Sequence, residues 1–293
     1  MNQESQLALL ETDDKPVLKG QLLKWIGNKQ RMADEILSFF PKHFGTYFEP
    51  FLGSGGVLGT LAPAKAVASD SFAPLIEIWQ TLSASPDILK NWYSERWHEM
   101  MSGEKVAGFE RIKARYNARP NGADLLFICR SCYGGVVRFR KRDGYISTPC
   151  GIHQPISPSS FAERVDNWRP RVSGAEFRRM EYGEALEMAQ SQDLVYCDPP
   201  YIDSQAILYG AQSFSLEHLL TVIEESKRRG VFVALSIDGT KKSGDRVCDV
   251  PIPEGLFERE VFIQCGRSML KRFQMNGKSL ESEHVSDRLL LTF

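Results

Sequence analysis

The tetrapeptide Asp198-Pro199-Pro200-Tyr201 combines groups that can hold a flat ring carrying an amino group. Its two prolines stiffen the backbone and remove two N–H donors. The Asp198 carboxylate and the Pro199 carbonyl can then both accept hydrogen bonds from one NH2 group, which makes its nitrogen more available for attack. Tyr201 adds an aromatic face for stacking. We therefore predict catalytic roles for Asp198, Pro199 and Tyr201, with a plain proline-rich turn as the alternative.

A glycine-rich turn, which begins at Glu49 and includes Gly53 and Gly55, is the second candidate site. Glycines between a strand and a helix let the backbone approach a ligand without a β-carbon in the way. Leu58 stands where a dinucleotide fingerprint has its third glycine, and the turn lacks the Gly-Lys-Ser/Thr of a P-loop. Asp70, at the end of the next predicted strand, can accept hydrogen bonds from ribose hydroxyls. Together they favour a nucleoside ligand, with a tight turn and a capping aspartate as the alternative.

The predicted strands and helices place these residues at one edge of a sheet. A capped helix is predicted at 215–229, and strands are predicted at 46–49, 65–69, 194–197, 231–236, 258–264 and 288–293. The strand, helix and strand around the glycine turn imply a parallel pair with a right-handed crossover. Open α/β sheets bind ligands beyond the carboxyl ends of their strands. We therefore expect an α/β fold with a doubly wound, mostly parallel sheet and an antiparallel C-terminal strand.

The middle of the chain differs from the rest in composition. It is rich in Trp, Tyr and Arg and lacks a clear alternation of strands and helices. Between Arg111 and Arg142 stand nine lysines or arginines and one acid, Asp124. Such local positive charge neutralises phosphates, although solvated surfaces would also explain it. We predict a flexible N-terminal tail at 1–19, a catalytic domain formed by 20–80 and 168–293, and an inserted, mostly helical domain at 81–167 whose positive charge suits a nucleic acid.

The composition indicates a globular protein, because 42% of the 293 residues are hydrophobic. The chain has no run of eighteen apolar residues, and its first sixteen residues lack a signal-peptide pattern, so we expect a cytoplasmic location. A zinc-like ligand spacing is formed by Cys129, Cys132, Cys150 and His153. Cys129 nevertheless stands in an apolar run typical of a buried cysteine. Zinc is therefore an alternative, and we predict no metal.

Three motifs, taken together, resemble those of a known family. The chain resembles the Dam-like, alpha-group DNA adenine N6-methyltransferases through Lys24-Trp25-Ile26-Gly27-Asn28-Lys29, Glu49-Pro50-Phe51-Leu52-Gly53-Ser54-Gly55 and Asp198-Pro199-Pro200-Tyr201. The likeness runs from about Leu22 to the C-terminus and places a recognition domain between the last two motifs. It implies a fold of the S-adenosylmethionine-dependent methyltransferase type, with S-adenosyl-L-methionine as cofactor. It also implies double-stranded DNA as substrate, with the target adenine flipped out of the helix.

The resemblance also implies roles for individual residues. Contacts to the cofactor are expected from Trp25, Lys29, Glu49, Gly53, Gly55, Asp70, Tyr182, Glu184 and Asp198. Contacts to DNA are expected from Lys24, Tyr133, Arg138 and Pro149. The family usually has aspartate where Glu184 stands, and it has Asn-Gly where Gly134-Gly135 follow the aromatic residue. These departures mean that the recognition sequence is not carried over from the family.

Several alternatives follow from the same residues. Cytosine N4 methylation is the nearest, because the same hydrogen bonds suit any exocyclic amino group. RNA could be the substrate, or the chain could be a DNA-binding protein that has lost catalysis; the intact Asp198 and Tyr201 argue against the loss. The resemblance further implies a monomer in a bacterial or phage-infected cytoplasm, associated with the nucleoid. A cognate restriction endonuclease that acts on the same site is a candidate partner.

Overall fold

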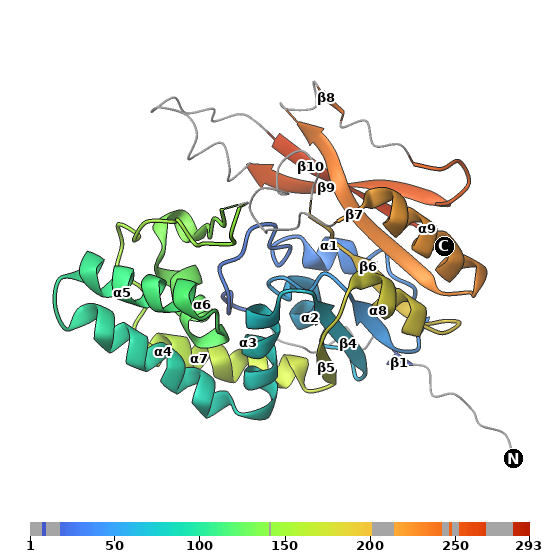
Figure 1. The fold of residues 1–293 in the computed structure, drawn as a ribbon. Helices are drawn as coiled ribbons and strands as arrows, with labels where there is room; N and C mark the ends of the chain where they lie inside the picture. The colour runs from blue at the N-terminus through green and yellow to red at the C-terminus, as the bar shows by residue number, and fades with distance from the viewer. Residues whose placement is uncertain are drawn as a thin grey trace, which may run out of the picture.

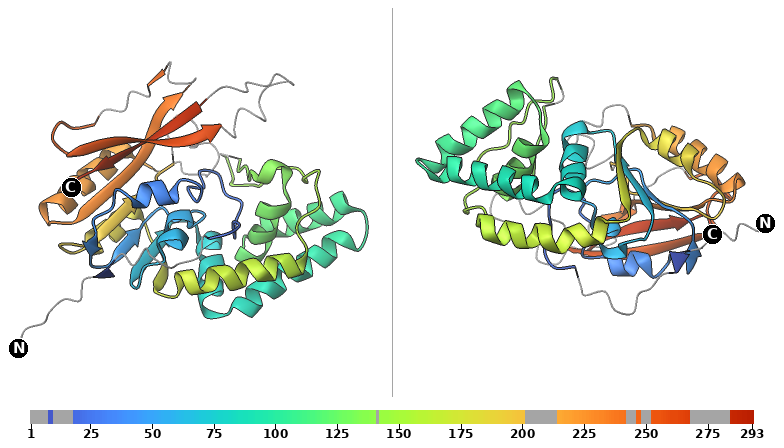
Figure 2. Two further views of the ribbon diagram at one scale, coloured as in Figure 1. Left: turned by 180° about the vertical axis from the view of Figure 1, so that it is seen from behind. Right: turned by 90° about the horizontal axis from the view of Figure 1, so that it is seen from below.

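The structure, a computed structural model, describes residues 8–9, 18–140, 142–200, 214–241, 246–247, 252–267 and 284–293. A helical part lies beside a part built around a sheet, in the first view and in two further views (Figures 1 and 2). The strands of the eight-stranded sheet are β3 (Tyr47–Glu49), β4 (Ala66–Asp70), β5 (Ala175–Arg179), β6 (Leu194–Cys197), β7 (Phe232–Lys241), β8 (Arg246–Val247), β9 (Arg259–Arg267) and β10 (His284–Leu291).

The strands follow the order β5-β4-β3-β6-β7-β10-β9, and β8 pairs with β7. The five strands from β5 to β7 in this order are parallel, whereas β10 runs antiparallel between β7 and β9. The α/β class and the mostly parallel sheet are therefore confirmed. The strand order reverses at β3, because β4 and β5 lie on one side of it and β6 on the other. A reversal of this kind leaves a crevice at the carboxyl ends of β3 and β6.

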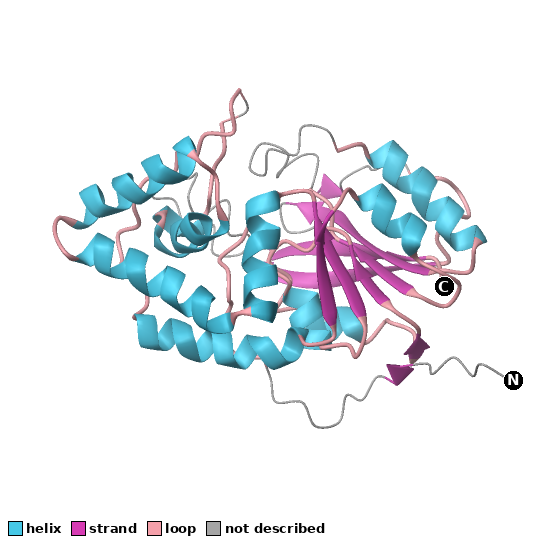
Figure 3. Cartoon of the chain, turned by 60° about the horizontal axis from the view of Figure 1, so that its bottom comes forward, coloured by secondary structure: helices cyan, strands magenta, loops and turns pink. Residues whose placement is uncertain are grey.

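Two hydrophobic clusters cover the two faces of the sheet. Successive side chains of a strand point to opposite faces, so along β3 Tyr47 belongs to the first cluster and Phe48 to the second. Both faces are buried by helices, as parallel sheets require, which gives three layers (Figure 3). The first face is covered by α1 (Ala33–Leu37) and α2 (Gly56–Leu61), and the second by α8 (Tyr182–Met188) and α9 (Leu216–Arg228).

The helical part lies between β4 and β5 in the chain. It contains α3 (Ala73–Ala84), α4 (Pro86–Met101), α5 (Lys105–Ala118), α6 (Gly122–Ser131), the short η1 (Tyr133–Gly135), α7 (Pro158–Trp168) and η2 (Arg169–Val172). These helices stand where a mostly helical segment was expected, while its status as a separate domain stays a prediction. Helix α3 runs through the expected boundary at residue 80, and the rings of Trp79 and Trp168 lie 5.5 Å apart.

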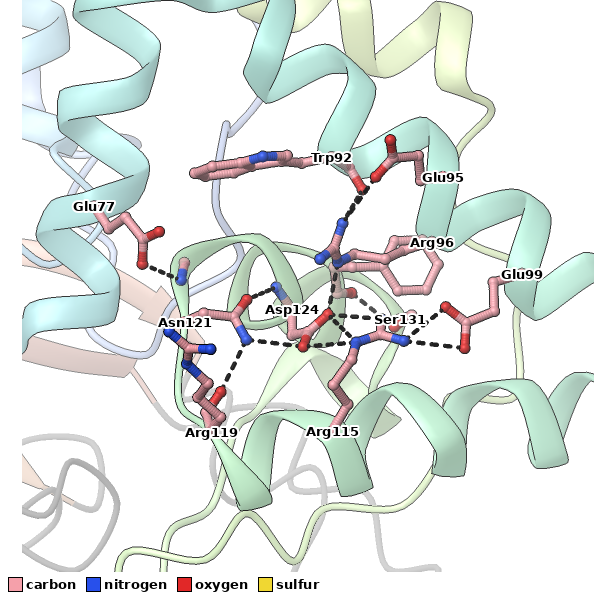
Figure 4. Close-up of polar contacts among 12 residues, drawn as sticks. Glu77, Trp92, Glu95, Arg96, Glu99, Arg115, Arg119, Asn121, Asp124 and Ser131 are labelled. Atoms are coloured by element: carbon pink, nitrogen blue, oxygen red, sulfur yellow. Dashed lines mark hydrogen bonds and ion pairs between the residues drawn. The ribbon is translucent and has the colours of Figure 1, made fainter.

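A fully buried carboxylate joins three helices of this part (Figure 4). Asp124 on α6 accepts hydrogen bonds from Arg96 on α4, at 2.7 Å, and from Arg115 on α5, at 2.8 Å. The Asn121 amide donates a further bond of 2.9 Å, and Glu99 accepts a bond of 3.0 Å from Arg115. Burial raises the pKa of Asp124, but these donors outweigh it, and the pKa lies below its usual value. The ionised carboxylate therefore fixes α4, α5 and α6 to one another.

Some of the basic side chains of this segment therefore form ion pairs or hydrogen bonds within the protein. Arg115 pairs with Asp124, and the buried Arg130 donates two bonds of 2.9 Å to the carbonyls of Gln21 and Leu22. Burial lowers the pKa of Arg130 to about 10. The basic residues counted in the sequence thus overstate the charge that this segment offers to phosphates.

The segment 1–19, expected as a flexible tail, contains β1 (Ala8–Leu9), which pairs antiparallel with β2 (His43–Phe44), and its Leu18 packs against the core. Strand β5 was not predicted. It is an edge strand of the sheet, and its sequence, Ala-Glu-Phe-Arg-Arg, has only one buried apolar residue. The alternation of apolar and polar residues that predicts a strand is therefore absent. Within the described residues, none of the helices is both long and apolar enough to span a membrane.

Candidate active site

The carboxyl ends of neighbouring parallel strands meet at one open cavity. Glu49 ends β3, Asp70 ends β4, and Asp198 directly follows β6. This arrangement follows from the reversal of strand order at β3, which brings residues distant in the chain together. Among the predicted cofactor contacts, those that line the cavity are Trp25, Lys29, Glu49, Gly53, Asp70, Tyr182 and Asp198.

The glycine turn holds a shape that depends on glycine at two positions. Gly53 and Gly55 have positive φ angles of 48° and 61°, which other residues adopt only with strain. The Gly53 N–H donates to the Asp70 carboxylate at 3.2 Å, and the Trp79 indole donates to the Gly53 carbonyl at 3.1 Å. A β-carbon at Gly55 would lie 2.8 Å from the Trp79 ring. Gly55 therefore packs against the Trp79 ring and does not line the cavity.

Lys29 lies between two carboxylates inside the cavity. Its ammonium nitrogen, Nζ, is 2.8 Å from Oδ1 of Asp198 and 3.3 Å from Oδ2 of Asp287. Lys29 is only 5% exposed, so the charges interact through little solvent. A residue predicted to contact the cofactor thus pairs directly with a residue predicted to be catalytic.

Two further carboxyl groups in the cavity have raised pKa values. Burial raises the pKa of Glu49 to about 8, although the Tyr47 hydroxyl donates to its Oε2 at 2.7 Å. Burial likewise raises the pKa of Asp70 to about 6, against the opposing effect of N–H donors from Phe72 and Gly53. At neutral pH, Glu49 is therefore mainly protonated and Asp70 mainly ionised.

Aromatic rings form one wall of the cavity. The rings of Phe51 and Tyr182 stack with centroids 5.2 Å apart, and Phe214 meets Phe51 edge-on at 5.9 Å. The Tyr182 hydroxyl lies 2.8 Å from Nδ1 of His218 on α9, which fixes the ring. Glu184 does not line this cavity, because it stands two residues beyond Tyr182 on α8 and faces another direction. Such a wall suits a flat heterocycle.

The predicted DNA contacts gather on a hairpin-like segment next to the cavity. The Tyr133 N–H donates to the Pro149 carbonyl at 2.9 Å, and isolated bridges pair Cys132 with Cys150 and Phe139 with Ile146. The side chains of Tyr133, Arg138 and Pro149 are all exposed on this segment.

Lys24 and a row of aromatic rings connect this segment to the cavity. A β-carbon at Gly135 would lie 2.8 Å from Cδ of Lys24, so Lys24 packs against the turn that follows Tyr133. The Phe139 ring lies 5.5 Å from Phe72, and Phe72 lies 6.2 Å from Trp25. Both Phe72 and Trp25 line the cavity. The exposed segment therefore sits directly against residues that shape the cavity.

The zinc alternative finds no support in the described parts of the chain. Cys129 and Cys132 are buried in the core, and the Cys150 thiol contacts the Gly151 carbonyl at 3.5 Å. Within those parts, no group of three or more His, Cys, Asp or Glu side chains could hold a metal ion. Cys132 and Cys150 are brought together by an isolated antiparallel backbone bridge.

The catalytic motif is described up to its second proline. Pro199 is buried, and Pro200 lines the cavity beside Asp198. Tyr201 lies outside the described residues. Sequence reasoning missed Asp287, as well as Phe51 and Phe214 of the aromatic wall. For Asp287 a signal existed, since it is an acid beside the apolar run Leu289–Leu291 in a predicted strand.

Comparisons with known proteins agree with this geometry. Residues 25–253 match the family of D12 class N6 adenine-specific DNA methyltransferases. A type II methyltransferase of Lactococcus lactis, M1.LlaDCHI, is 26% identical over 232 residues, which cover 73% of this chain and 79% of that protein. The DNA adenine methylase of Escherichia coli K12 has the same identity and the same coverage.

Among solved structures, an rRNA methyltransferase of Streptomyces viridochromogenes, AviRa, has a TM-score of 0.36 and 11% identity, over 90% of this chain and 84% of that one. A similarity at that level does not indicate a shared function. The family match spans most of the chain, including the lysine motif, the glycine turn and the Asp-Pro-Pro-Tyr motif. This chain therefore belongs to the D12 class of N6 adenine-specific DNA methyltransferases, enzymes that methylate adenine in DNA.

Proposed function

We propose that this enzyme binds S-adenosyl-L-methionine in the cavity and methylates the N6 amino group of an adenine flipped out of duplex DNA. The observation that supports this most is the place of Asp198, at the carboxyl end of β6 inside a cavity with an aromatic wall. An adenine in a duplex is stacked and paired, so its amino group can enter such a cavity only after the base has left the helix.

The cavity residues fit the proposed cofactor. Asp70 is ionised at neutral pH and can accept hydrogen bonds from ribose hydroxyls, while Phe51 and Tyr182 offer faces for a purine. When bound, the cofactor supplies the methyl group that is transferred.

Asp198 holds the central role in the proposed mechanism. Its carboxylate and the Pro199 carbonyl accept the two hydrogens of the adenine amino group and orient the nitrogen lone pair toward the cofactor. Tyr201 stacks on the base. Lys29 keeps Oδ1 of Asp198 in place, at 2.8 Å. The proton of the methylated amino group leaves to water, so no side chain needs to act as a strong base.

The proposed path of the DNA runs over the exposed hairpin-like segment. Tyr133 and Pro149 stand where they can fill the gap left by the flipped base, and Lys24 lies against the adjacent turn. Arg138 is our candidate for reading a guanine through its O6 and N7 edge. A monomeric state, a cytoplasmic location and a paired restriction endonuclease are further proposals, which rest on the family resemblance.

The direct test is to express the protein in a bacterial host that lacks DNA methylation and to map modified bases in its genome. We expect N6-methyladenine that recurs in one short motif and is absent from cells with the empty vector. N4-methylcytosine in its place would contradict the proposed target atom. A soluble protein that binds S-adenosylmethionine but leaves the genome unmodified would contradict duplex DNA as the substrate.

Cofactor binding should weaken at acid pH. Because Asp70 must be ionised to accept ribose hydroxyls and its pKa is about 6, affinity should be nearly constant above pH 7. Below pH 6 it should fall about tenfold per pH unit. Titration calorimetry between pH 5 and 8 measures this change. Asp70→Asn should bind more weakly at pH 8 and lose the step near pH 6, whereas an unchanged step in this variant would show that Asp70 is not the group responsible.

Arg138→Ala should relax the recognition sequence at one base position. A guanine contact contributes about 1–3 kcal/mol of discrimination, so rates on duplexes with that base pair changed should rise relative to the cognate duplex by about 5- to 150-fold. Arg142→Ala serves as the comparison, because this arginine is 85% exposed at the tip of the same segment. A uniform loss on every duplex would mark Arg138 as a phosphate contact.

A further inference from the structure

Asp287 is a buried acid on β10 that points at the catalytic motif from the antiparallel half of the sheet. Its residue is 8% exposed, and its Oδ2 lies 3.3 Å from Nζ of Lys29. The register of β10 shifts between Ser286 and Asp287 in the pairing with β7. From Asp287 onward the pairing with β7 is regular, so Asp287 lies on the same face of the sheet as Leu289 and Leu291 of the first hydrophobic cluster. The regular alternation of β10 thus directs this carboxylate to the face on which Tyr196, two residues before Asp198, also lies.

The two carboxylates compete for one ammonium group. Lys29 lies 2.8 Å from Oδ1 of Asp198 and 3.3 Å from Oδ2 of Asp287, and it is almost fully buried. If Asp198 held this charge alone, the pairing would withdraw electron density from the carboxylate and weaken it as an acceptor for a substrate amino group. A second carboxylate shares the positive charge. It also gives Lys29 a second contact, at 3.3 Å, which restricts the movement of the ammonium group.

We propose that Asp287 is a positioning residue for methyl transfer, which acts through Lys29 on the orientation and the acceptor strength of Asp198. This inference rests on the proposed catalytic role of Asp198. Asp287 itself is expected to touch neither the target base nor the transferred methyl group. Its influence should therefore disappear when the charge of Lys29 is removed.

Asp287→Asn tests the proposal, because the amide keeps the shape of the side chain and loses its charge. We expect the single-turnover rate at saturating DNA and S-adenosylmethionine to fall about 10- to 100-fold, the usual effect of one hydrogen bond between charged groups. The dissociation constant for duplex DNA should change less than about threefold. Asp287→Glu restores the charge and should recover part of the rate.

A double-mutant cycle separates action through Lys29 from any other effect. Lys29→Met should itself be slow, and adding Asp287→Asn to it should cause less than about a twofold further loss. An equal loss in both backgrounds would overturn the proposal, as would a wild-type rate for Asp287→Asn. Asp193→Asn is the matched control, since Asp193 is equally buried and accepts from the Thr46 N–H at 2.6 Å, but it precedes β6 and so lies at the other end of that strand from Asp198.

Thermal stability and the Asp198→Ala variant provide two further tests of the role of Asp287. A purely structural role of Asp287 would lower the melting temperature and leave the rate per folded molecule unchanged, and that result would also overturn the proposal. Asp198→Ala is measured in parallel. If Asp198→Ala remains active, the proposed function of the site fails. If it is inactive while Asp287→Asn has the wild-type rate, only the inference about Asp287 fails.

Discussion

Asp198→Ala is expected to reduce methyl transfer by about 1,000-fold or more while duplex binding stays within a few-fold of wild type. One positioned hydrogen-bonding group in a water-poor site already contributes about 100- to 1,000-fold to rate, and Asp198 would both orient the amino group and polarise it. Overall folding should suffer little, because Lys29 keeps Asp287 as a partner at 3.3 Å. Transfer of a labelled methyl group in a single turnover measures the rate, and fluorescence anisotropy measures DNA binding.

Asp198→Asn separates charge from shape in the same experiment. The amide retains an acceptor oxygen but loses the negative charge and presents an NH2 group, so we expect a loss nearly as large as for alanine. A variant at position 198 that keeps the wild-type rate would refute the proposed mechanism. A variant that loses DNA binding and catalysis in equal measure would instead assign Asp198 to substrate binding.

Asp124→Ala is expected to destabilise the protein by about 3 kcal/mol, the usual cost of removing one partner from a buried ion pair. The change would leave the guanidinium groups of Arg96 and Arg115 without the carboxylate that holds them at 2.7 and 2.8 Å. Arg115 keeps Glu99 at 3.0 Å, which places the loss at the lower end of the range. Urea denaturation followed by circular dichroism gives the free energy of unfolding.

The control for this prediction is Asp166→Ala. Asp166 pairs with Lys90 at 2.6 Å between α7 and α4, but its side chain is 62% exposed. Exposed pairs contribute little, so its free energy of unfolding should hardly change. Equal losses in the two variants would show that the burial of Asp124 is not the cause. If Asp124→Ala weakens DNA binding without a change in stability, the network would instead serve the recognition surface.

Much of the active site was predictable because it rests on strand ends and glycine turns. The apolar run Leu194–Cys197 fixed the place of Asp198, and the end of β4 fixed that of Asp70. Asp287 escaped prediction because its contact with Lys29 joins residues from opposite ends of the chain, which only the tertiary structure brings together. Arg115 was counted among the charges available to phosphates for a similar reason, since only the tertiary structure shows that it forms an ion pair with Asp124.

The pairing of β4 with β5 bears on how enzymes of this kind could diverge. The two strands are direct neighbours in parallel register, from Ala66 opposite Ala175 to Asp70 opposite Arg179, and all of the chain from α3 to α7 lies between them. Both ends of that segment are thus fixed by the sheet, while α4, α5 and α6 hold one another through Asp124. On the proposed path of the DNA over the hairpin-like segment, a single recombination event that exchanges α4 to α7 would transfer a new sequence preference, and the recipient would keep the residues of the cavity.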